Sequence, residues 1–435
     1  MKQLDWVRER WRNEGLYFVQ IVIARALYHV VFVPLSFVLA PLLRRANVRV
    51  WYHDYPQHIG HLTLDPDCYV KEGLVGLRPP ARKTFFVCRR DRIANSEILR
   101  HWRRYLVPVT APIPHDAFRA LARRPGVGVD GLRYFSLVGE TAAYPEIYRR
   151  YSGRPAVLGL TDADHARGRQ ARARLGIPAD AWYVCVHCRE PGFYDDDVHA
   201  YRNASIANFT DAMAMITAAG GWCVRMGDPS MTPLAPAPQV VDYAHHAERA
   251  PWLDVYLVAS ARFFLGTSSG LLGVAAAFGV PAGLTNQAPM SVVLPIGEHD
   301  VGIPKLMWDE NQQRILTFAE VLGSPAGNFR FEKHYAEAGL RPLENDPRDI
   351  ADLTREMLER TAGDVEVTAD DEALQQAFKR LLAPGHYSYG AGSRVGRDFL
   401  RRHRALLDVP SETRSSRTPE AVGMDRAPTT LSPDG

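Results

Sequence analysis

The sequence predicts an α/β protein with two doubly wound, Rossmann-like domains, and three observations support that prediction. The chain has 435 residues, too many for one ordinary core and suitable for two α/β domains. Apolar runs of strand length alternate with helical patterns, most clearly between residues 182 and 284. Glycine and proline stand where those helices should begin and end. Alternation of this kind is typical of parallel sheets covered by helices.

The first half of the chain shows the alternation only weakly. Residues 48–52 and 84–88 are short runs rich in β-branched and aromatic side chains, which predicts buried strands. Residues 59–62 stand between a turn-rich stretch and a helical pattern, and Asn95 is expected to cap a second helix. Prolines are so frequent between residues 108 and 125 that the sequence leaves the strand order of this half open.

The second half of the chain gives a clearer pattern. Asn203 is expected to cap a helix with an apolar stripe from Ile206 to Ala219, and a helix from Ser269 is ended by Gly279. Five strands are expected, at residues 182–187, 222–226, 239–242, 262–265 and 280–284. Further helices are expected at residues 346–360, 371–382 and 394–407.

These patterns divide the chain into five segments. They are a basic and apolar helical segment at 1–45, Rossmann-like domains at 46–160 and 161–345, further helices at 346–408 and a tail at 409–435. The tail consists mainly of Ser, Thr, Pro and charged residues. Such a segment buries too little apolar surface to fold, so we expect it to be disordered.

The N-terminal segment has the composition of a membrane-surface helix. Residues 16–43 are mostly apolar, although Arg25, His29 and Pro34 interrupt them, and arginines flank both ends. Basic flanks with nearby aromatic side chains favour a helix lying in the headgroup region of an anionic leaflet. A single membrane span and a helix packed on the protein's own surface are the alternatives. The segment starts too far from Met1 for a signal peptide.

The composition limits which binding partners and which cellular compartment are expected. The net charge of +3 gives no reason to expect nucleic acid, and five cysteines favour a reducing compartment over a disulfide framework. Cys185 and Cys188 form a C-x-x-C, interpreted as two small residues at a buried strand rather than a redox or zinc pair. The histidines within 53–61 and at 245–246 lack zinc-like spacing, so no metal is expected.

Polar side chains follow three strands of the second half, at the point where each strand ends. Since ligands of parallel α/β sheets lie beyond the carboxyl ends of strands, these side chains are expected to gather in one place. They are His187 and Arg189, then Arg225, Gly227 and Asp228, then Thr267, Ser268, Ser269 and Gly270.

This set of residues suits a diphosphate. Gly270 lets the chain turn tightly at a helix start, where hydroxyls, free N–H groups and the helix dipole favour an anion. Arg189 and Arg225 would add positive charge from neighbouring strands. Ordinary N-capping and, for Arg225, a surface ion pair are the alternatives. Positive groups here would stabilise the charge on a departing nucleoside diphosphate without a metal ion.

The order of these motifs resembles a family of bacterial glycosyltransferases of surface-polysaccharide biosynthesis. The resemblance covers roughly residues 48–407, and its H-x-R after a strand is similar to the nucleotide-diphosphate site of fucosyltransferase-like enzymes. The motifs are His187-Cys188-Arg189-Glu190, Tyr201-Arg202-Asn203, residues 224–228, Val241-Asp242-Tyr243, residues 254–257 and residues 266–270.

The resemblance implies a GT-B architecture, in which two Rossmann-like domains face a cleft. The donor site would lie in the second domain, and the first would contact the acceptor. His187 and Arg189 would contact the donor phosphates, with Asn203 starting the helix behind them. The nucleotide base of the donor, or its ribose, would be held by Asp228, Asp242 or Tyr243.

The catalytic candidates are one histidine and two aspartates. The resemblance places residues 59–62 in a loop facing the cleft, with His61 as a base or acceptor contact and a structural cap as the alternative. Asp195 and Asp196 are candidates for a general base that faces the acceptor hydroxyl. A D-x-D metal site and a solvated acidic loop are the alternative interpretations of residues 195–197.

We therefore expect sugar transfer from a nucleotide-activated donor to a glycan or lipid-linked acceptor, without a cofactor. The protein would be cytoplasmic and held peripherally at the inner leaflet of the membrane. A nucleotide-sugar epimerase of the same fold and a non-catalytic nucleotide-sugar-binding protein are the alternatives. The apolar N-terminal segment favours transfer, since such epimerases are usually soluble. The sequence leaves the donor sugar, the acceptor and the stereochemistry open.

Overall fold

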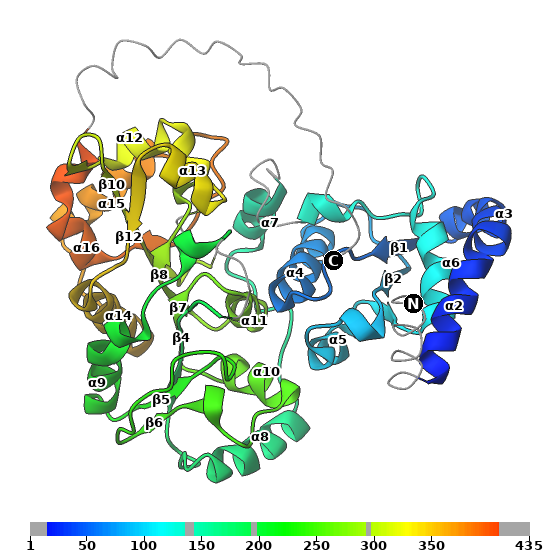
Figure 1. The fold of residues 1–435 in the computed structure, drawn as a ribbon, viewed down its shortest axis with the longest axis horizontal. Coiled ribbons are helices and arrows are strands. Elements are labelled where there is room, and N and C mark those ends of the chain that lie inside the picture. The colour runs from blue at the N-terminus through cyan, green and yellow to red at the C-terminus, as the bar shows by residue number, and fades with distance from the viewer. Residues whose placement is uncertain (1–14, 135–142, 193–197, 293–296, 409–435) are drawn as a thin grey trace, which may run out of the picture.

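The computed structural model of the chain describes residues 15–134, 143–192, 198–292 and 297–408 and shows two α/β domains beside an N-terminal helix (Figure 1). The first domain has a parallel sheet of three strands in the order β1-β2-β3. These strands are β1 (Val48–Tyr52), β2 (Lys83–Val87) and β3 (Val107–Val109). Along the open edge of β1, the backbone of Val50 hydrogen-bonds with Val127 and Val129.

Helices cover both faces of this first sheet because its strands are apolar on both sides. Val50 packs in one cluster with α6 (Pro112–Ala122) and the N-terminal helix. Its neighbour Trp51 points the other way and packs in a second cluster with α4 (Ile59–Leu74) and α5 (Ser96–Trp102). This alternation follows from the two-residue period of a strand.

The second domain has a parallel sheet of seven strands in the order β13-β9-β8-β7-β4-β5-β6. The chain runs outward from β4 through β5 to β6 and returns on the other side of β4 with β7, so the sheet has its switch point between β4 and β7. The strands are β4 (Tyr183–His187), β5 (Trp222–Arg225), β6 (Val240–Val241), β7 (Phe264–Thr267), β8 (Ala282–Gln287), β9 (Val301–Pro304) and β13 (Arg394–Val395).

Helices lie on both faces of the second sheet as well. α8 (Asp162–Arg174) leads into its first strand, and its strands are connected by α9 (Thr210–Ala218), α10 (Pro251–Ala259), α11 (Gly270–Phe278) and α14 (Pro347–Ala362). A small antiparallel sheet follows, of β10 (Leu306–Asp309), β11 (Arg314–Ile315) and β12 (Leu340–Leu343). The remaining helices are α7 (Ala143–Tyr151), α12 (Phe318–Leu322), α13 (Glu332–Glu337), α15 (Ala369–Leu381) and α16 (Arg397–Arg402).

The predicted α/β fold class is confirmed: the chain has two domains built on parallel sheets. Each of the five strands predicted in the second half overlaps an observed strand, from β4 to β8. One helix prediction is wrong at its start, because residues 394–395 form β13 at the sheet edge before α16 begins. The predicted tail at 409–435 lies outside the described residues.

The two domains contact each other through α4 and α11, whose first turns cross at two glycines, Gly60 and Gly270. A second contact joins α5 to α10, where the side-chain N–H of Asn95 donates to the carbonyl of Pro251 at 2.8 Å. Asn95 is also the predicted cap of α5, since its Oδ1 accepts from the Glu97 backbone. The predicted junction at residues 59–62 therefore lies at the boundary between the domains.

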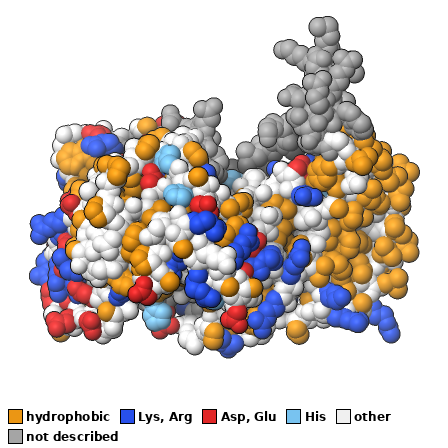
Figure 2. Space-filling model, turned by 90° about the horizontal axis from the view of Figure 1, so that it is seen from below, with side chains coloured by type: hydrophobic (Ala, Val, Ile, Leu, Met, Phe, Trp, Pro, Cys, Tyr) orange, Lys and Arg blue, Asp and Glu red, His pale blue; other side chains and the backbone are white. Residues whose placement is uncertain are grey.

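The N-terminal helix packs on the first domain with one face and leaves the other exposed. It comprises α2 (Leu16–Leu27), a π-helical turn (Tyr28–Phe32) and α3 (Val33–Arg45). Phe18, Ala24 and Ala40 are buried, and α2 and α3 both contact α6. Figure 2 shows apolar side chains gathered over this end of the molecule. The exposed set, here called the apolar face, is Leu16, Val22, Ile23, Val30, Val31, Leu35, Phe37, Val38 and Leu42.

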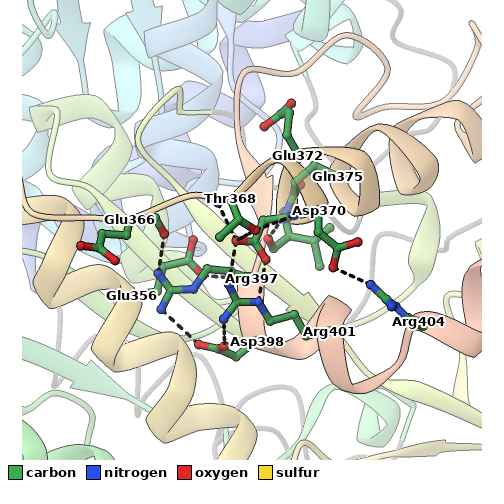
Figure 3. A network of polar contacts seen from close by, with 12 residues as sticks. Glu356, Glu366, Thr368, Asp370, Glu372, Gln375, Arg397, Asp398, Arg401 and Arg404 are labelled. Carbon is green, nitrogen blue, oxygen red and sulfur yellow. Dashed lines mark hydrogen bonds and ion pairs between the residues drawn. The ribbon is translucent and has the colours of Figure 1, made fainter.

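The C-terminal helices are held together by ion pairs (Figure 3). Arg401 of α16 pairs with Asp371 of α15 at 2.6 Å. Arg397 pairs with Glu359 of α14 at 2.9 Å, and its backbone N–H donates to Glu356. Asp371 and Glu356 are almost fully buried, so these contacts satisfy carboxylates that water cannot reach.

Candidate functional site

The candidate site lies at the carboxyl ends of β4, β5 and β7, which are neighbours in the second sheet. Two hydrogen bonds tie the segments after these strands together. The backbone N–H of Arg189 donates to Thr267 Oγ1 at 2.9 Å, and the guanidinium of Arg202 donates to the Ser268 carbonyl at 2.7 Å. The sheet therefore brings the H-x-R segment beside the start of α11, as the sequence predicts.

The first turn of α11 has backbone N–H groups with no partner inside the helix, as every helix start does. Ser269 is the N-cap residue, yet its side chain makes no capping hydrogen bond. Its Oγ is buried and has no hydrogen-bond partner among the described residues. A buried hydroxyl without a partner is costly, so this end of α11 has polar groups available for a ligand.

His187 is buried at the end of β4, with its Nδ1 3.2 Å from the carbonyl oxygen of Met226. A carbonyl can only accept, so Nδ1 carries the proton. Burial lowers the pKa of His187 to about 4, and the nearby charges of Arg225 and Arg189 act in the same direction. A neutral ring of this tautomer offers a lone pair at Nε2, which suits a hydroxyl donor better than a phosphate oxygen.

Arg225 does not face a ligand, which corrects the prediction that it contacts the donor. The residue is fully buried, and its guanidinium pairs with Glu190 at 2.6 Å and with Asp242 at 3.2 Å. It also donates to the Thr232 carbonyl at 3.0 Å. With these acceptors around it, Arg225 holds the segments that follow β4 and β5 and has no surface left for a phosphate.

Two other donor candidates are also engaged inside the protein. Tyr243 is fully buried and donates its hydroxyl to Asp254 at 2.7 Å, so the predicted direct contact with the base or ribose does not agree with its placement. Asp242 accepts from Arg225 and from the backbone N–H of Leu234 at 3.0 Å. Both residues support the loop around the site.

Asp228 stays close to the site, in the turn after β5. It follows Gly227 and accepts from the Ser230 backbone N–H at 2.8 Å. Its negative charge acts on His187 and raises the pKa of that ring, against the larger effect of burial. Asp228 thus remains beside the H-x-R segment, as predicted.

Asn203 has a different role from the one predicted. It does not cap the helix, because Ser205 caps a short turn at Ile206–Phe209 that leads into α9. The Oδ1 of Asn203 instead accepts from Arg189 Nε at 3.1 Å, which orients that guanidinium. The Asn203 carbonyl accepts from Lys305 at 2.6 Å.

Three cations near the site were missed by the sequence reasoning: Arg202, Lys305 and Arg330. Arg330 has a buried Nη2 with no partner among the described residues, and burial lowers its pKa. Arg202 lies close enough for its charge to act on Arg330. Arg202 stands inside a quoted motif and could have been found, whereas Arg330 comes from a loop that no local pattern marks.

Across the domain boundary, the first turn of α4 carries His61, whose Nδ1 lies 3.2 Å and 3.3 Å from the two carboxylate oxygens of Asp65. His61 is inside the helix, so the alternative interpretation as a cap is not supported. The neighbouring His58 has its pKa lowered to about 4 by burial, and also by His61 and by His199 of the second domain. Histidines of both domains thus lie near this junction.

The remaining predictions concern cysteines and acidic residues. All five cysteines are buried and unbridged, and burial raises the pKa of Cys185 and Cys188, as expected for structural thiols. Within the described residues, no group of three or more His, Cys, Asp or Glu side chains is arranged to hold a metal ion. Asp195 and Asp196 lie outside the described residues.

Comparison with known proteins gives distant structural likenesses. No family model and no curated protein matches the chain. A family 9 glycosyl transferase from Veillonella parvula aligns with a TM-score of 0.29 and 10% identity, over 55% of this chain and 80% of its own. E. coli heptosyltransferase WaaC with ADP-2-deoxy-2-fluoro heptose aligns with a TM-score of 0.31 and 13% identity, over 58% and 91%.

The wall teichoic acid polymerase TagF aligns with a TM-score of 0.30 and 9% identity, over 80% of this chain and 92% of its own. All three TM-scores are near 0.3, so the function proposed below is argued from the geometry of this chain.

Proposed function

We propose that this protein is a glycosyltransferase that binds the diphosphate of a nucleotide-activated sugar at the start of α11. One observation carries the proposal: at the switch point of the second sheet, the start of α11 has the unpartnered hydroxyl of Ser269 beside the H-x-R segment. Switch points and helix starts are where α/β proteins bind phosphates. Arg189 and Arg202 reach this place by hydrogen bonds to Thr267 and Ser268.

The chemistry follows from the charges around that place. When the sugar leaves the donor, the bond between its anomeric carbon and the phosphate oxygen breaks, and negative charge grows on the diphosphate. The guanidinium groups and the N–H groups of α11 stabilise that charge. The acceptor oxygen forms the new bond to the anomeric carbon and gives its proton to a base. His61 is the described residue best placed for this role, since α4 and α11 meet at their first turns.

The residues predicted for the donor divide into two roles. The phosphate contact is formed by five of the predicted residues, to which we add Arg202 and Arg330. The five are Arg189, Thr267, Ser268, Ser269 and Gly270. Arg225 and Asn203 act behind them as positioning residues, because Arg225 pairs with Glu190 and Asn203 accepts from Arg189. His187 and Asp228 are proposed to face hydroxyl groups of the donor, since a neutral imidazole accepts hydrogen bonds.

We also propose that the protein binds the cytoplasmic leaflet through the apolar face and takes a lipid-linked or glycan acceptor there. The helix Leu16–Arg45 is long and apolar enough to cross a membrane by length and composition. Its inner face, however, packs on α6 through Phe18, Ile21 and Ala24. A helix held in this way lies in the interface, because spanning would expose the first domain's own core contacts.

A ligand screen tests the donor assignment. The full chain is heated with nucleoside diphosphates, nucleoside monophosphates or inorganic phosphate, and nucleoside diphosphates are expected to raise the melting temperature most. A panel of nucleotide sugars with lipid-linked and soluble glycan acceptors then measures release of free nucleoside diphosphate. Conversion of the sugar with no release would favour an epimerase, and binding with no turnover would favour a binding protein. No shift with any nucleotide would contradict the proposed function.

A further inference from the structure

We propose that Asp65 is a positioning residue that keeps the proton of His61 on Nδ1, so that Nε2 carries the lone pair. His53 is the second residue that holds Asp65 in place. The use of this arrangement as a general base rests on the proposed function, whereas the protonation pattern itself does not. The proposal starts from three side chains of the first domain that the sequence pattern did not connect.

The spacing along α4 brings His61 and Asp65 together, because residues four apart lie on the same face of a helix. The two carboxylate oxygens are 3.2 Å and 3.3 Å from His61 Nδ1. A carboxylate only accepts hydrogen bonds, so the proton of a neutral His61 resides on Nδ1. The other ring nitrogen is then basic, and an imidazole orients its base nitrogen by this kind of bond in other catalytic sites.

His53 reaches the same carboxylate from the residue after β1. Its Nε2 lies 3.1 Å from the His61 carbonyl oxygen and 3.4 Å from Asp65 Oδ2. The carbonyl can only accept, so His53 Nε2 carries a proton and points it at both acceptors. Asp65 thus accepts the N–H of His61 and lies 3.4 Å from His53 Nε2, while the hydrogen bond of His53 fixes the backbone of His61.

Packing makes this arrangement rigid. Asp65 is 3% exposed and His53 is 4% exposed, so water screens neither of their contacts. The backbone N–H of His53 donates to the Val87 carbonyl at 3.0 Å, which anchors it to the sheet. Trp102 Nε1 donates to the Leu62 carbonyl at 2.9 Å and holds the first turn of α4. These contacts therefore hold the ring of His61 in one orientation.

A purely structural role for Asp65 would stabilise α4 without selecting a tautomer. The two roles differ in what Asp65→Asn does. An asparagine fills the same space but can donate its amide N–H to Nδ1, which moves the proton of His61 to Nε2. An equivalent change in a serine protease triad leaves the geometry intact and disables the base.

The experiment uses the full chain labelled with ¹⁵N-histidine, with His61→Gln to assign the ring signals. Wild-type protein is expected to show a protonated Nδ1 and an unprotonated Nε2 on His61, and Asp65→Asn is expected to reverse this pattern. His53→Gln, which keeps an N–H donor, should preserve it. A wild-type ring with its proton on Nε2, or an unchanged ring in folded Asp65→Asn, would overturn the proposal. The tautomer of His61 in the wild type tests the proposal even if the Asp65→Asn variant does not fold.

Sugar transfer provides the second readout. Where the donor screen identifies a substrate, Asp65→Asn is expected to lower kcat about 100-fold or more with little change in KM for the donor, because the phosphate contacts lie in the other domain. If the wild type shows the expected tautomer but transfers no sugar, the positioning role of Asp65 is supported and the proposed function is contradicted. The expected tautomer together with unchanged kcat in Asp65→Asn would overturn the use of His61 as the base.

Discussion

Gly60 and Gly270 touch backbone to backbone across the domain boundary: a Cβ atom on Gly60 would lie 3.1 Å from the Cα of Gly270. A Cβ on Gly270 would in turn lie 2.6 Å from Ile59 Cγ2 and 3.0 Å from the backbone nitrogen of Gly60. Both helices begin at this crossing, so the contact sets the distance between His61 on α4 and Ser269 before α11.

Gly270→Ala is therefore expected to push the first turns of α4 and α11 apart. The added methyl group meets the Ile59 side chain at 2.6 Å and the Gly60 backbone nitrogen at 3.0 Å. Overpacking of this kind costs about 1–3 kcal/mol of the free energy of unfolding. Urea unfolding and nucleoside diphosphate affinity both report the change. Gly159→Ala is the control, because its Cβ would meet nothing within 4 Å. Equal stability and affinity in the two variants would contradict a tight crossing.

Arg189→Ala, Arg202→Ala and Arg330→Ala are each expected to weaken nucleoside diphosphate binding about 10- to 100-fold. A hydrogen bond to a charged group contributes roughly 1.5–3 kcal/mol, which corresponds to this range. Isothermal titration calorimetry at two salt concentrations measures the affinity and shows how far salt screens the attraction between the arginines and the diphosphate. Arg169→Ala removes an exposed arginine of α8 and should bind like the wild type. Wild-type affinity in all three site variants would exclude this phosphate contact.

Arg225→Ala is expected to destabilise the fold rather than only the ligand complex. It leaves the buried carboxylate of Glu190 without its cation, and breaking a buried pair costs about 3–5 kcal/mol. Urea unfolding of the ligand-free protein measures the loss. Combining Arg225→Met with Glu190→Gln removes the unpaired charge and should restore part of the stability. If the single variant unfolds at the wild-type urea concentration, Arg225 does not support the site.

Stability should fall as the pH drops from about 6.5 to about 4, in part because of His187. Its folded pKa of about 4 lies below the ordinary value of 6.5, so the unfolded chain binds a proton that the folded protein refuses. The stabilisation is complete above pH 6.5 and reaches at most about 3 kcal/mol. His187→Gln should flatten this part of the unfolding profile. An unchanged pH slope in that variant would show that His187 is protonated in the fold.

Glutamate substitutions on the apolar face should release the protein from membranes. Val30, Phe37 and Val38 are 77%, 62% and 67% exposed, and burying each in lipid contributes roughly 1.5–3 kcal/mol. Sedimentation with vesicles containing phosphatidylglycerol measures binding, and vesicles of phosphatidylcholine alone should bind less. Val367→Glu, at an exposed valine before α15, is the matched control. If all variants sediment with the vesicles as the wild type does, the membrane contact lies elsewhere on the protein.

The strand pattern was enough to place the candidate site because parallel strands end at one edge of a sheet. That rule predicts that His187 and Arg189 gather with the start of α11, and the bond from the Arg189 backbone N–H to Thr267 agrees with this placement. The helical pattern correctly predicted a helix start near residues 59–62, but the resemblance placed these residues in a loop, and they form the first turn of α4 instead.

The direction of a side chain at a strand end could not be predicted. Arg225 ends β5 with the same chemistry as Arg189, but Glu190 and Asp242 lie around it and turn it into the protein. Those partners come from other segments, and only their packing shows which arginine is enclosed. Asp65 differs, because its spacing of four from His61 is visible in the sequence, so this contact could have been predicted although it was not. Arg330 comes from a distant loop and lies close enough to Arg202 for their charges to interact, which no local pattern reveals.

The apolar face lies on the N-terminal helix, which packs on the first domain, and the larger sheet lies away from it on the other side of the molecule (Figure 1). On the proposed function, a water-soluble donor then arrives from the bulk phase by diffusion in three dimensions. A lipid-linked acceptor instead arrives by lateral diffusion within the leaflet. Turnover would therefore depend on the surface density of the acceptor lipid. Adding inert lipid lowers that density, so it would slow turnover even when the total amount of acceptor is unchanged.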